Sequence, residues 1–273
     1  MLAARTPIQY AEKVKQFLLK KKVIHSHYKA VREMDFLFFP LTKKVVVSHA
    51  TIVNTKFSFP PCNRVPTIDE LLKSKLTPLQ FSLLPRSQEI IGTILILEIP
   101  PKLQLKEKMI AEAYLQSHPH VTTVVKKSDI HSGIFRTRKV KIIAGKRSKE
   151  TIHTESGVKM KLHLEKTYFS ARSSNERLRI ARLVKPNEFI LVLFSGIAPY
   201  PLVLAKHSPA QKIYGIEFNP LAHQYALENV TLNNLDKKII IYCGDVRTVV
   251  PKITTTFDRI IMPLPKTGDQ FLG

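Results

Sequence analysis

The pattern of hydrophobic positions changes at about residue 166. Beyond it, short and almost continuous apolar runs alternate with segments whose apolar residues recur at helical spacing. Such runs are typical of strands in a parallel sheet that helices cover on both faces. The predicted strands are FILVL (189–193), KIYGIEF (212–218), KIIIYCGD (238–245) and FDRIIMPL (257–264), with helices at 174–184, 198–206 and 220–234. The sequence therefore predicts a doubly wound α/β domain over residues 166–273.

Two smaller α/β units precede this domain. In residues 79–165, the apolar run at 90–99 predicts one buried strand and the spacing at 105–117 predicts a helix. Four further strands are predicted at 121–125, 139–145, 151–156 and 159–165. The last of these alternates polar with apolar residues, which indicates one solvent-facing side.

Residues 1–58 form the other small unit. The chain begins with a predicted amphipathic helix that ends at residues 20–22, and its apolar face carries Ala11, Val14, Phe17 and Leu18. Strands are predicted at 35–41 and 44–50. Four prolines then interrupt residues 59–78, which indicates a linker with a short helix at 68–74.

Charge and cysteine usage narrow the class of protein. The 273 residues carry 43 Lys and Arg against 21 Asp and Glu, a net charge of +22, and most of the excess lies in the first 165 residues. Such surfaces bind phosphate-rich partners through counterion release, so nucleic acid is the predicted partner and a merely solvated basic surface the alternative. No apolar run reaches the roughly 18 residues of a membrane span. The two cysteines, Cys62 and Cys243, predict no metal site and fit a reducing cytoplasm.

A candidate nucleoside site lies in FSGIAPY (194–200), directly after the first strand of the last domain. At that position a doubly wound sheet binds its ligand, and Gly196 lets the backbone come close to it. Glu217 follows 21 positions later at the end of the second strand, where a carboxylate can accept from ribose hydroxyls. Asp245 follows the third strand and can accept from a purine amine. Taken alone, each of these residues is an ordinary turn or strand-end residue. Taken in order, they predict a site for a nucleoside without phosphates. S-adenosylmethionine is the predicted ligand, because it suits a loop with one glycine.

Several stretches resemble one enzyme family over nearly the whole chain. TYFSARSSNERLRIA (167–181) resembles Y-F-S-P-R-L-[SA]-T-E-R, FSGIAPY resembles F-A-G-V-G-P-F, and MPLPK (262–266) resembles N-L-P-K. These are motifs of the tRNA (guanine-N1)-methyltransferases of archaea and eukaryotes, which methylate guanosine 37 with S-adenosylmethionine. The resemblance implies a Rossmann-like class I methyltransferase domain behind two small domains, the first contacting the outer corner of tRNA and the second binding RNA. The implied partner is tRNA, contacted at its anticodon loop and outer corner. The resemblance also implies a monomer at full length.

The resemblance further implies roles for individual residues. Glu176 is expected to be the general base and Arg136 to hold the guanine. Removal of the N1 proton by a carboxylate and donation to guanine O6 by an arginine fit that chemistry. The expected donor-site residues are Tyr168, Arg172, Arg177, Phe194, Gly196, Glu217, Phe218, Asp245, Val246 and Pro263.

The sequence also allows other interpretations of Glu176 and of the activity. Glu176 also fits a capping box with Ser173, and taken without the resemblance that is the better interpretation. Val192, Ala198 and Pro263 depart from the family's Asp, Gly and Asn. The chain also ends after its fourth predicted catalytic strand where the family has seven, so we expect this form to bind donor weakly. Alternative activities are an aminocarboxypropyl transfer in wybutosine synthesis, methylation of a tricyclic guanosine, or non-catalytic tRNA binding.

Overall fold

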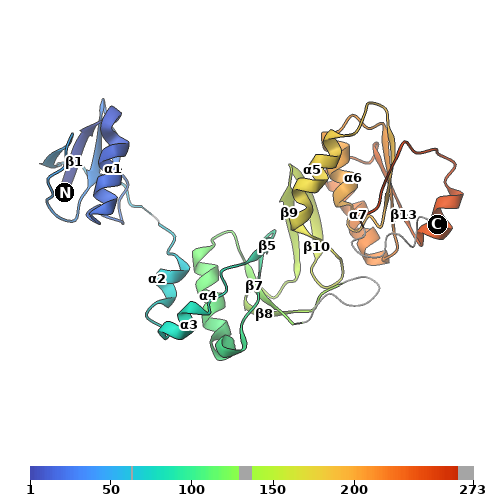
Figure 1. Ribbon diagram of the computed structural model, residues 1–273, viewed down its shortest axis with the longest axis horizontal. Coiled ribbons are helices and arrows are strands. Elements are labelled where there is room, and N and C mark those ends of the chain that lie inside the picture. Colours follow the sequence, from blue (N-terminus) through green and yellow to red (C-terminus); the bar gives the residue numbers. More distant parts are fainter. Residues whose placement is uncertain (63, 129–136, 264–273) are drawn as a thin grey trace. The chain divides into compact units, whose positions relative to one another are not determined.

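A boundary after Pro66 divides the chain into two units, Met1–Pro66 and Thr67–Gly273. The computed structural model describes residues 1–62, 64–128 and 137–263 (Figure 1). The boundary lies inside the segment 59–78 that we expected to be a linker. The short helix predicted there is confirmed as α2 (Ile68–Leu72), and its Leu72 is fully buried in the core of the second unit.

The first unit is a four-stranded antiparallel sheet with a helix against it. Its elements are β1 (Leu2–Pro7), a 3-10 turn (Ile8–Tyr10), α1 (Ala11–Lys20), β2 (Val31–Glu33), β3 (Phe36–Pro40) and β4 (Thr51–Asn54), with sheet order β2-β3-β1-β4. The helix buries Val14 and Leu18 against the sheet, whereas Phe17 stays 38% exposed and lies off the buried face.

Two predictions for this unit are wrong. Residues 2–7 form a strand and not the start of the helix. Pro7 lacks the N–H that a helix interior needs, so α1 begins only after it. The strand predicted at 44–50 does not form, and Val46 there is 94% exposed. The strand at this place is β4, which pairs with β1.

The second unit begins with a mixed sheet covered by helices on one face. Its elements are α2, α3 (Pro78–Ser82), β5 (Glu89–Ile91), β6 (Ile94–Leu97), a 3-10 segment (Pro101–Lys106), α4 (Glu107–Ser117), β7 (Thr123–Lys127) and β8 (Val140–Gly145), with order β5-β6-β7-β8. The run at 90–99 is a hairpin and not one strand. It turns at Gly92, whose φ of +55° favours glycine, and the apolar residues on both sides of the turn hide it from the sequence pattern.

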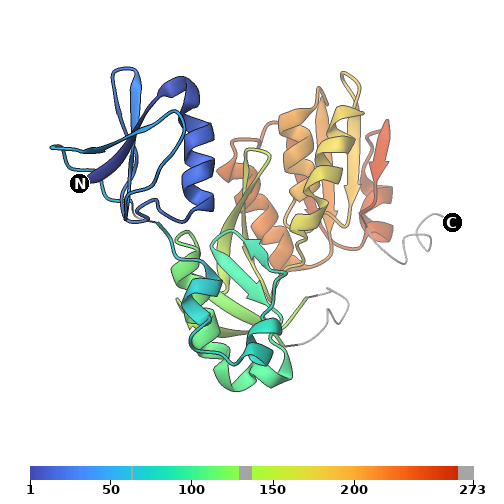
Figure 2. The ribbon, with the colours of Figure 1, turned by 60° about the vertical axis from the view of Figure 1, so that its left-hand side comes forward.

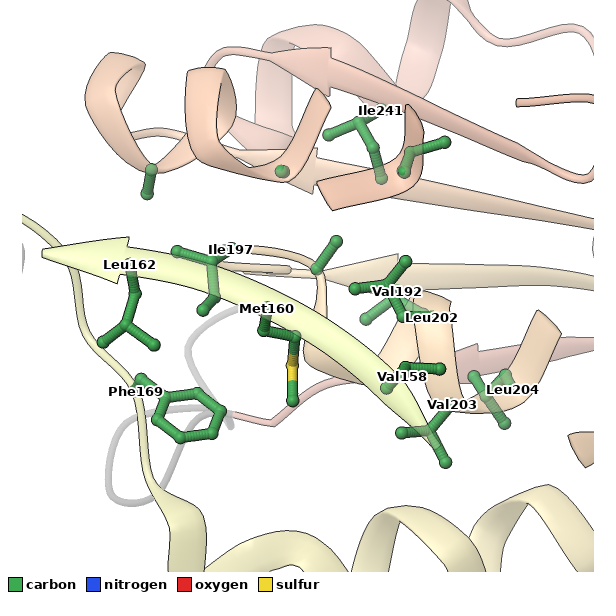
Figure 3. Close-up of a cluster of buried hydrophobic side chains, with 14 of the residues drawn as sticks. Val158, Met160, Leu162, Phe169, Val192, Ile197, Leu202, Val203, Leu204 and Ile241 are labelled. Atoms are coloured by element: carbon green, nitrogen blue, oxygen red, sulfur yellow. The ribbon is translucent and has the colours of Figure 1, made fainter. Parts of the chain in front are cut away.

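Side chains of β6 alternate between two cores. Leu95 and Leu97 pack with α2 and α4, whereas Ile94 and Ile96 join the core of the last domain. The hairpin of β9 (Glu150–Glu155) and β10 (Val158–His163) contributes to that same core. In Figure 3, Met160 and Leu162 of β10 point among Phe169, Ile197 and neighbouring apolar side chains. The middle sheet and this hairpin thus share a core with the last domain.

The last domain is the predicted parallel α/β layer structure. Its strands β11 (Phe189–Leu193), β12 (Lys212–Glu217), β13 (Ile239–Cys243) and β14 (Arg259–Ile261) are all parallel, in the order β13-β12-β11-β14. The helices are α5 (Ser174–Arg182) after a 3-10 turn (Ala171–Ser173), α6 (Pro199–His207), α7 (Pro220–Leu232) and α8 (Val246–Val249), which a 3-10 turn (Val250–Lys252) follows. Figure 2 shows helices beside this sheet. Residues of β11 enter both cores, Ile190 and Val192 on one face and Leu191 and Leu193 on the other, which explains the uninterrupted apolar run.

Candidate functional site

The loop between β11 and α6 has an unusual backbone. Phe194, Gly196 and Ala198 have φ values of +55°, +57° and +69°, in the left-handed region that favours glycine. Pro199 then begins α6, a position where its missing N–H costs no helical hydrogen bond. A Cβ added at Gly196 would lie 3.6 Å from the Tyr168 carbonyl oxygen and, apart from the two chain neighbours, close to no other described residue. Within the described part of the chain, the loop therefore leaves open space beside Gly196.

Glu217 is brought to this loop as the sequence predicted. Its Oε2 accepts a hydrogen bond from the Gly196 N–H at 2.7 Å, and its Oε1 accepts from the Asn219 N–H at 2.8 Å. Burial raises the pKa of Glu217, and the backbone hydrogen bonds oppose this shift. Asn219 caps α7 and donates to the Lys166 carbonyl at 2.9 Å. Three backbone N–H groups, those of Gly196, Phe218 and Asn219, thus fix the carboxylate at the end of β12.

Asp245 lies at the end of the neighbouring strand β13. It caps α8 by accepting from the Arg247 N–H at 2.9 Å, and the Arg247 guanidinium pairs with it at 2.6 Å. Hydrogen bonds from this side chain and this N–H lower the pKa of Asp245 to about 2. Arg247 is 75% exposed, so the pair forms at the solvent side of the strand end.

The other expected donor-site residues differ in exposure. Phe218 is 48% and Tyr168 38% exposed, whereas Val246 is buried in the small cluster under the strand ends. Pro263 follows β14 at the edge of the described residues. Val192, at the position where the family often has Asp, is fully buried in the core.

Glu176 lies on the exposed first turn of α5. Its two carboxylate oxygens accept from Arg179 Nε and Nη2, both at 2.7 Å, and the hydrogen bonds from Arg179 lower the pKa of Glu176. The capping-box interpretation is wrong, because the Ser173 side chain makes no capping hydrogen bond and the carboxylate turns to Arg179 instead. Arg172 is exposed on the preceding 3-10 turn.

Arg177 points to the opposite side of α5 and is buried. Its Nε donates to Glu155 Oε1 at 2.6 Å, its Nη2 pairs with Glu155 Oε2, and Nη2 also donates to the Ser170 carbonyl at 3.1 Å. Both side chains of this ion pair are 3% exposed. The pair connects α5 to β9, and we propose that Arg177 positions α5 rather than touching the donor. Arg136 lies outside the described residues.

The sequence interpretation missed two residues that position the site. Glu155 is one. The other is Asn229, which is fully buried on α7 and donates to the carbonyls of Ile197 and Lys161 at 3.1 and 3.0 Å. A lone Asn on the buried face of a helix is the only sequence signal for this contact, which connects the loop between β11 and α6 to β10.

Comparison with known proteins assigns the chain to a family. Residues 151–273 match the TRM5/TYW2 methyltransferase domain, residues 68–148 the TYW2 N-terminal domain, and residues 3–48 the tRNA methyltransferase 5 N-terminal domain. A tRNA (guanine(37)-N(1))-methyltransferase Trm5b of Pyrococcus abyssi is 34% identical over 271 residues, which span 99% of this chain and 78% of the relative. The chain belongs to the TRM5/TYW2 methyltransferase family. Members of this family use S-adenosylmethionine, as the motif resemblance implied.

Solved structures of this TRM5/TYW2 family share the fold. The complex of aTrm5 with tRNALeu has a TM-score of 0.73 and 26% identity, and the match covers 100% of this chain and 82% of that one. TYW2 of P. horikoshii in complex with MeSAdo has a TM-score of 0.62 and 30% identity, over 75% of this chain and 72% of that one. Among the described residues of this family member, no helix is long and apolar enough to cross a membrane.

Proposed function

We propose that this protein transfers the methyl group of S-adenosylmethionine to N1 of guanosine 37 in tRNA. The proposal is supported by the relative of that name, whose similarity extends over almost the whole chain. One observation at the site carries it: three backbone N–H groups hold the Glu217 carboxylate at a strand end, beside the described open space at Gly196. This arrangement fits a ribose better than a phosphate, which a carboxylate repels.

The residues at the strand ends fit the donor nucleoside. Glu217, an acceptor at the end of β12, suits the ribose hydroxyls, and Asp245, ionised through its low pKa, suits an adenine amine. The bound donor supplies a methyl group that its sulfonium has already activated. Around the nucleoside we place Tyr168, Phe194, Phe218, Val246 and Pro263, which are expected there from the family.

Glu176 is the proposed general base. Its ionised carboxylate takes the proton from guanine N1 as the methyl–nitrogen bond forms, and Arg136 donates to O6, where charge develops. Since Arg179 occupies both carboxylate oxygens, this pair opens when the guanine arrives. The target base must leave its stack to reach the carboxylate.

We further propose that the small N-terminal domain contacts the outer corner of tRNA and the second unit the anticodon loop, with one monomer per tRNA. The net charge of +22 supports binding to the RNA backbone.

The test is methylation of an unmodified tRNA transcript followed by nucleoside mass spectrometry. We expect N1-methylguanosine with guanosine at position 37 and none with adenosine there. Glu176→Gln should slow turnover about 100-fold to 10,000-fold, while donor affinity measured by calorimetry stays unchanged. Product at any other position or atom would refute the assignment.

A second candidate is aminocarboxypropyl transfer at the same nucleotide. One observation favours it: the middle domain matches the TYW2 N-terminal domain model. The co-product separates the two reactions, because methyl transfer leaves S-adenosylhomocysteine and aminocarboxypropyl transfer leaves methylthioadenosine. Methylation of a tricyclic guanosine derivative is distinguished by supplying tRNA that already carries that base.

A further inference from the structure

An open cavity of about 290 Å³ lies between the middle sheet and the segment that leads into α5. Glu98 and Lys127 line it from the ends of β6 and β7, and Ala171 and Arg172 line it from the other side. Of the residues expected at the donor site, Arg172 alone is in its lining. The cavity is therefore separate from the strand ends that carry Glu217 and Asp245.

The side-chain alternation of β6 explains why the cavity is polar. Ile94 and Ile96 are buried on the face that packs toward the last domain, and Glu98 is the next residue on that face. Leu97 pairs with Lys126 in the parallel register, so Glu98 and Lys127 stand side by side and form an ion pair. The apolar face thus ends in a carboxylate and an ammonium group where the cavity opens.

The charges in the cavity favour a ligand with both donors and acceptors. The hydrogen bond from Lys127 and, more weakly, the charge of Arg172 lower the pKa of Glu98, so it is an ionised acceptor. Lys127 and Arg172 are donors. Glu89, a second carboxylate in the lining, is paired with the buried Arg138 at 2.9 Å. The two carboxylates and the two cations of the lining leave no excess positive charge for a phosphate, whereas the edge of a nucleobase offers an amine beside a carbonyl or ring nitrogen.

We propose that this cavity binds one base of the anticodon loop adjacent to the target guanosine. The base is one with an exocyclic amine: Glu98 accepts from the amine, and Lys127 and Arg172 donate to the neighbouring acceptor. The apolar side chains of Ile90 and Ile96 contact its ring. The volume is at the lower limit of ligand pockets, about 300 Å³, and suits a single base.

This inference rests on the proposed function, because it takes the anticodon loop as the ligand. Arg172 precedes the proposed base Glu176 by four residues, through the 3-10 turn into α5. A nucleotide held at Arg172 is thus bound by the same segment that carries Glu176. Binding of the adjacent base would help to hold the anticodon loop open around the extruded guanosine 37.

The experiment is a double-mutant cycle on binding, which needs no turnover. Fluorescence anisotropy measures the affinity of the full chain for anticodon stem-loops with an abasic nucleotide at position 36, 37 or 38. We expect loss of one flanking base, at 36 or 38, to weaken wild-type binding about tenfold. Glu98→Gln should weaken binding of the intact stem-loop by a similar factor. The Glu98→Gln variant should bind the abasic stem-loop no more weakly than either change alone predicts.

Two further variants make the test specific. Lys127→Gln should show the same coupling. Arg86→Gln removes an exposed ion pair with Asp69 on the same domain, outside the cavity, and its effect should add to that of every abasic position. Glu98 is 71% exposed, so its substitution leaves the fold intact.

Three results would overturn the inference. Coupling confined to position 37 would mean that the cavity holds the target itself. Additive losses at every position would mean that no base enters it, and so would absence of stem-loop binding. A failure of the proposed function appears elsewhere, as absence of N1-methylguanosine with intact binding, so the two ideas can fail separately.

Discussion

The buried ion pair between Glu155 and Arg177 gives the most quantitative prediction. It joins the hairpin of β9 and β10 to α5, and both side chains are 3% exposed. Glu155→Gln keeps the size of the side chain and leaves the Arg177 guanidinium buried without its counter-charge. Removing one partner of a buried pair costs about 3–5 kcal/mol. For a domain of roughly 150–250 residues, each kcal/mol lowers the melting temperature by about 2–4 °C.

The predicted fall in melting temperature of the second unit is therefore about 6–20 °C. Differential scanning calorimetry measures it. His153, 4.0 Å from Glu155, offers no substitute for the lost carboxylate, because an imidazole is neutral or cationic. The double change Glu155→Leu with Arg177→Met should recover most of the loss, since an apolar pair of similar size replaces both charges.

Arg179→Gln is the matched control. It removes an equally well-formed bidentate pair on the same helix, but both of its side chains are exposed, so water screens the interaction and the melting temperature should barely change. The reasoning is refuted if Glu155→Gln unfolds at the wild-type temperature, or if the apolar double variant is less stable than the single one.

The remaining predictions concern the site. Glu217→Gln should weaken S-adenosylmethionine binding roughly 10-fold to 100-fold in calorimetry, because it removes a charged acceptor worth about 1.5–3 kcal/mol per hydrogen bond; unchanged affinity would place the ribose elsewhere. Arg179→Ala should move the acid limb of the kcat/KM profile to higher pH, since Arg179 lowers the pKa of Glu176 and its loss lets the carboxylate protonate sooner; a shift to lower pH would contradict this. Ser195→Ala should raise the melting temperature by roughly 2–4 °C, because the buried Ser195 hydroxyl has no hydrogen-bond partner among the described residues and costs about 1 kcal/mol; a lower melting temperature would show that the hydroxyl is satisfied.

The layer structure of the last domain could be predicted because its information is local. Runs such as FILVL are apolar on both faces only when helices cover both faces, and β11 has that environment. Gly196, Glu217 and Asp245 could be grouped because parallel strands place their carboxyl ends at one edge of a sheet. A hydrogen bond from the Gly196 N–H to Glu217 joins two of these three residues.

Other features depended on contacts that no local pattern encodes. The hairpin turn at Gly92 lies within an apolar run, because Ile91 of β5 and all four residues of β6 are buried. Glu176 forms a hydrogen bond with Arg179 instead of a capping box with Ser173, and this depended on where its side chain points. Glu155 and Arg177 are 22 residues apart, and only the packing of the hairpin against α5 makes them an ion pair. The sequence by itself determined the strands and helices of the last domain and which residues end its strands, because side-chain periodicity and chain direction fix both. The tertiary structure alone decided which charges are buried together and which face solvent, because these depend on residues distant in the sequence.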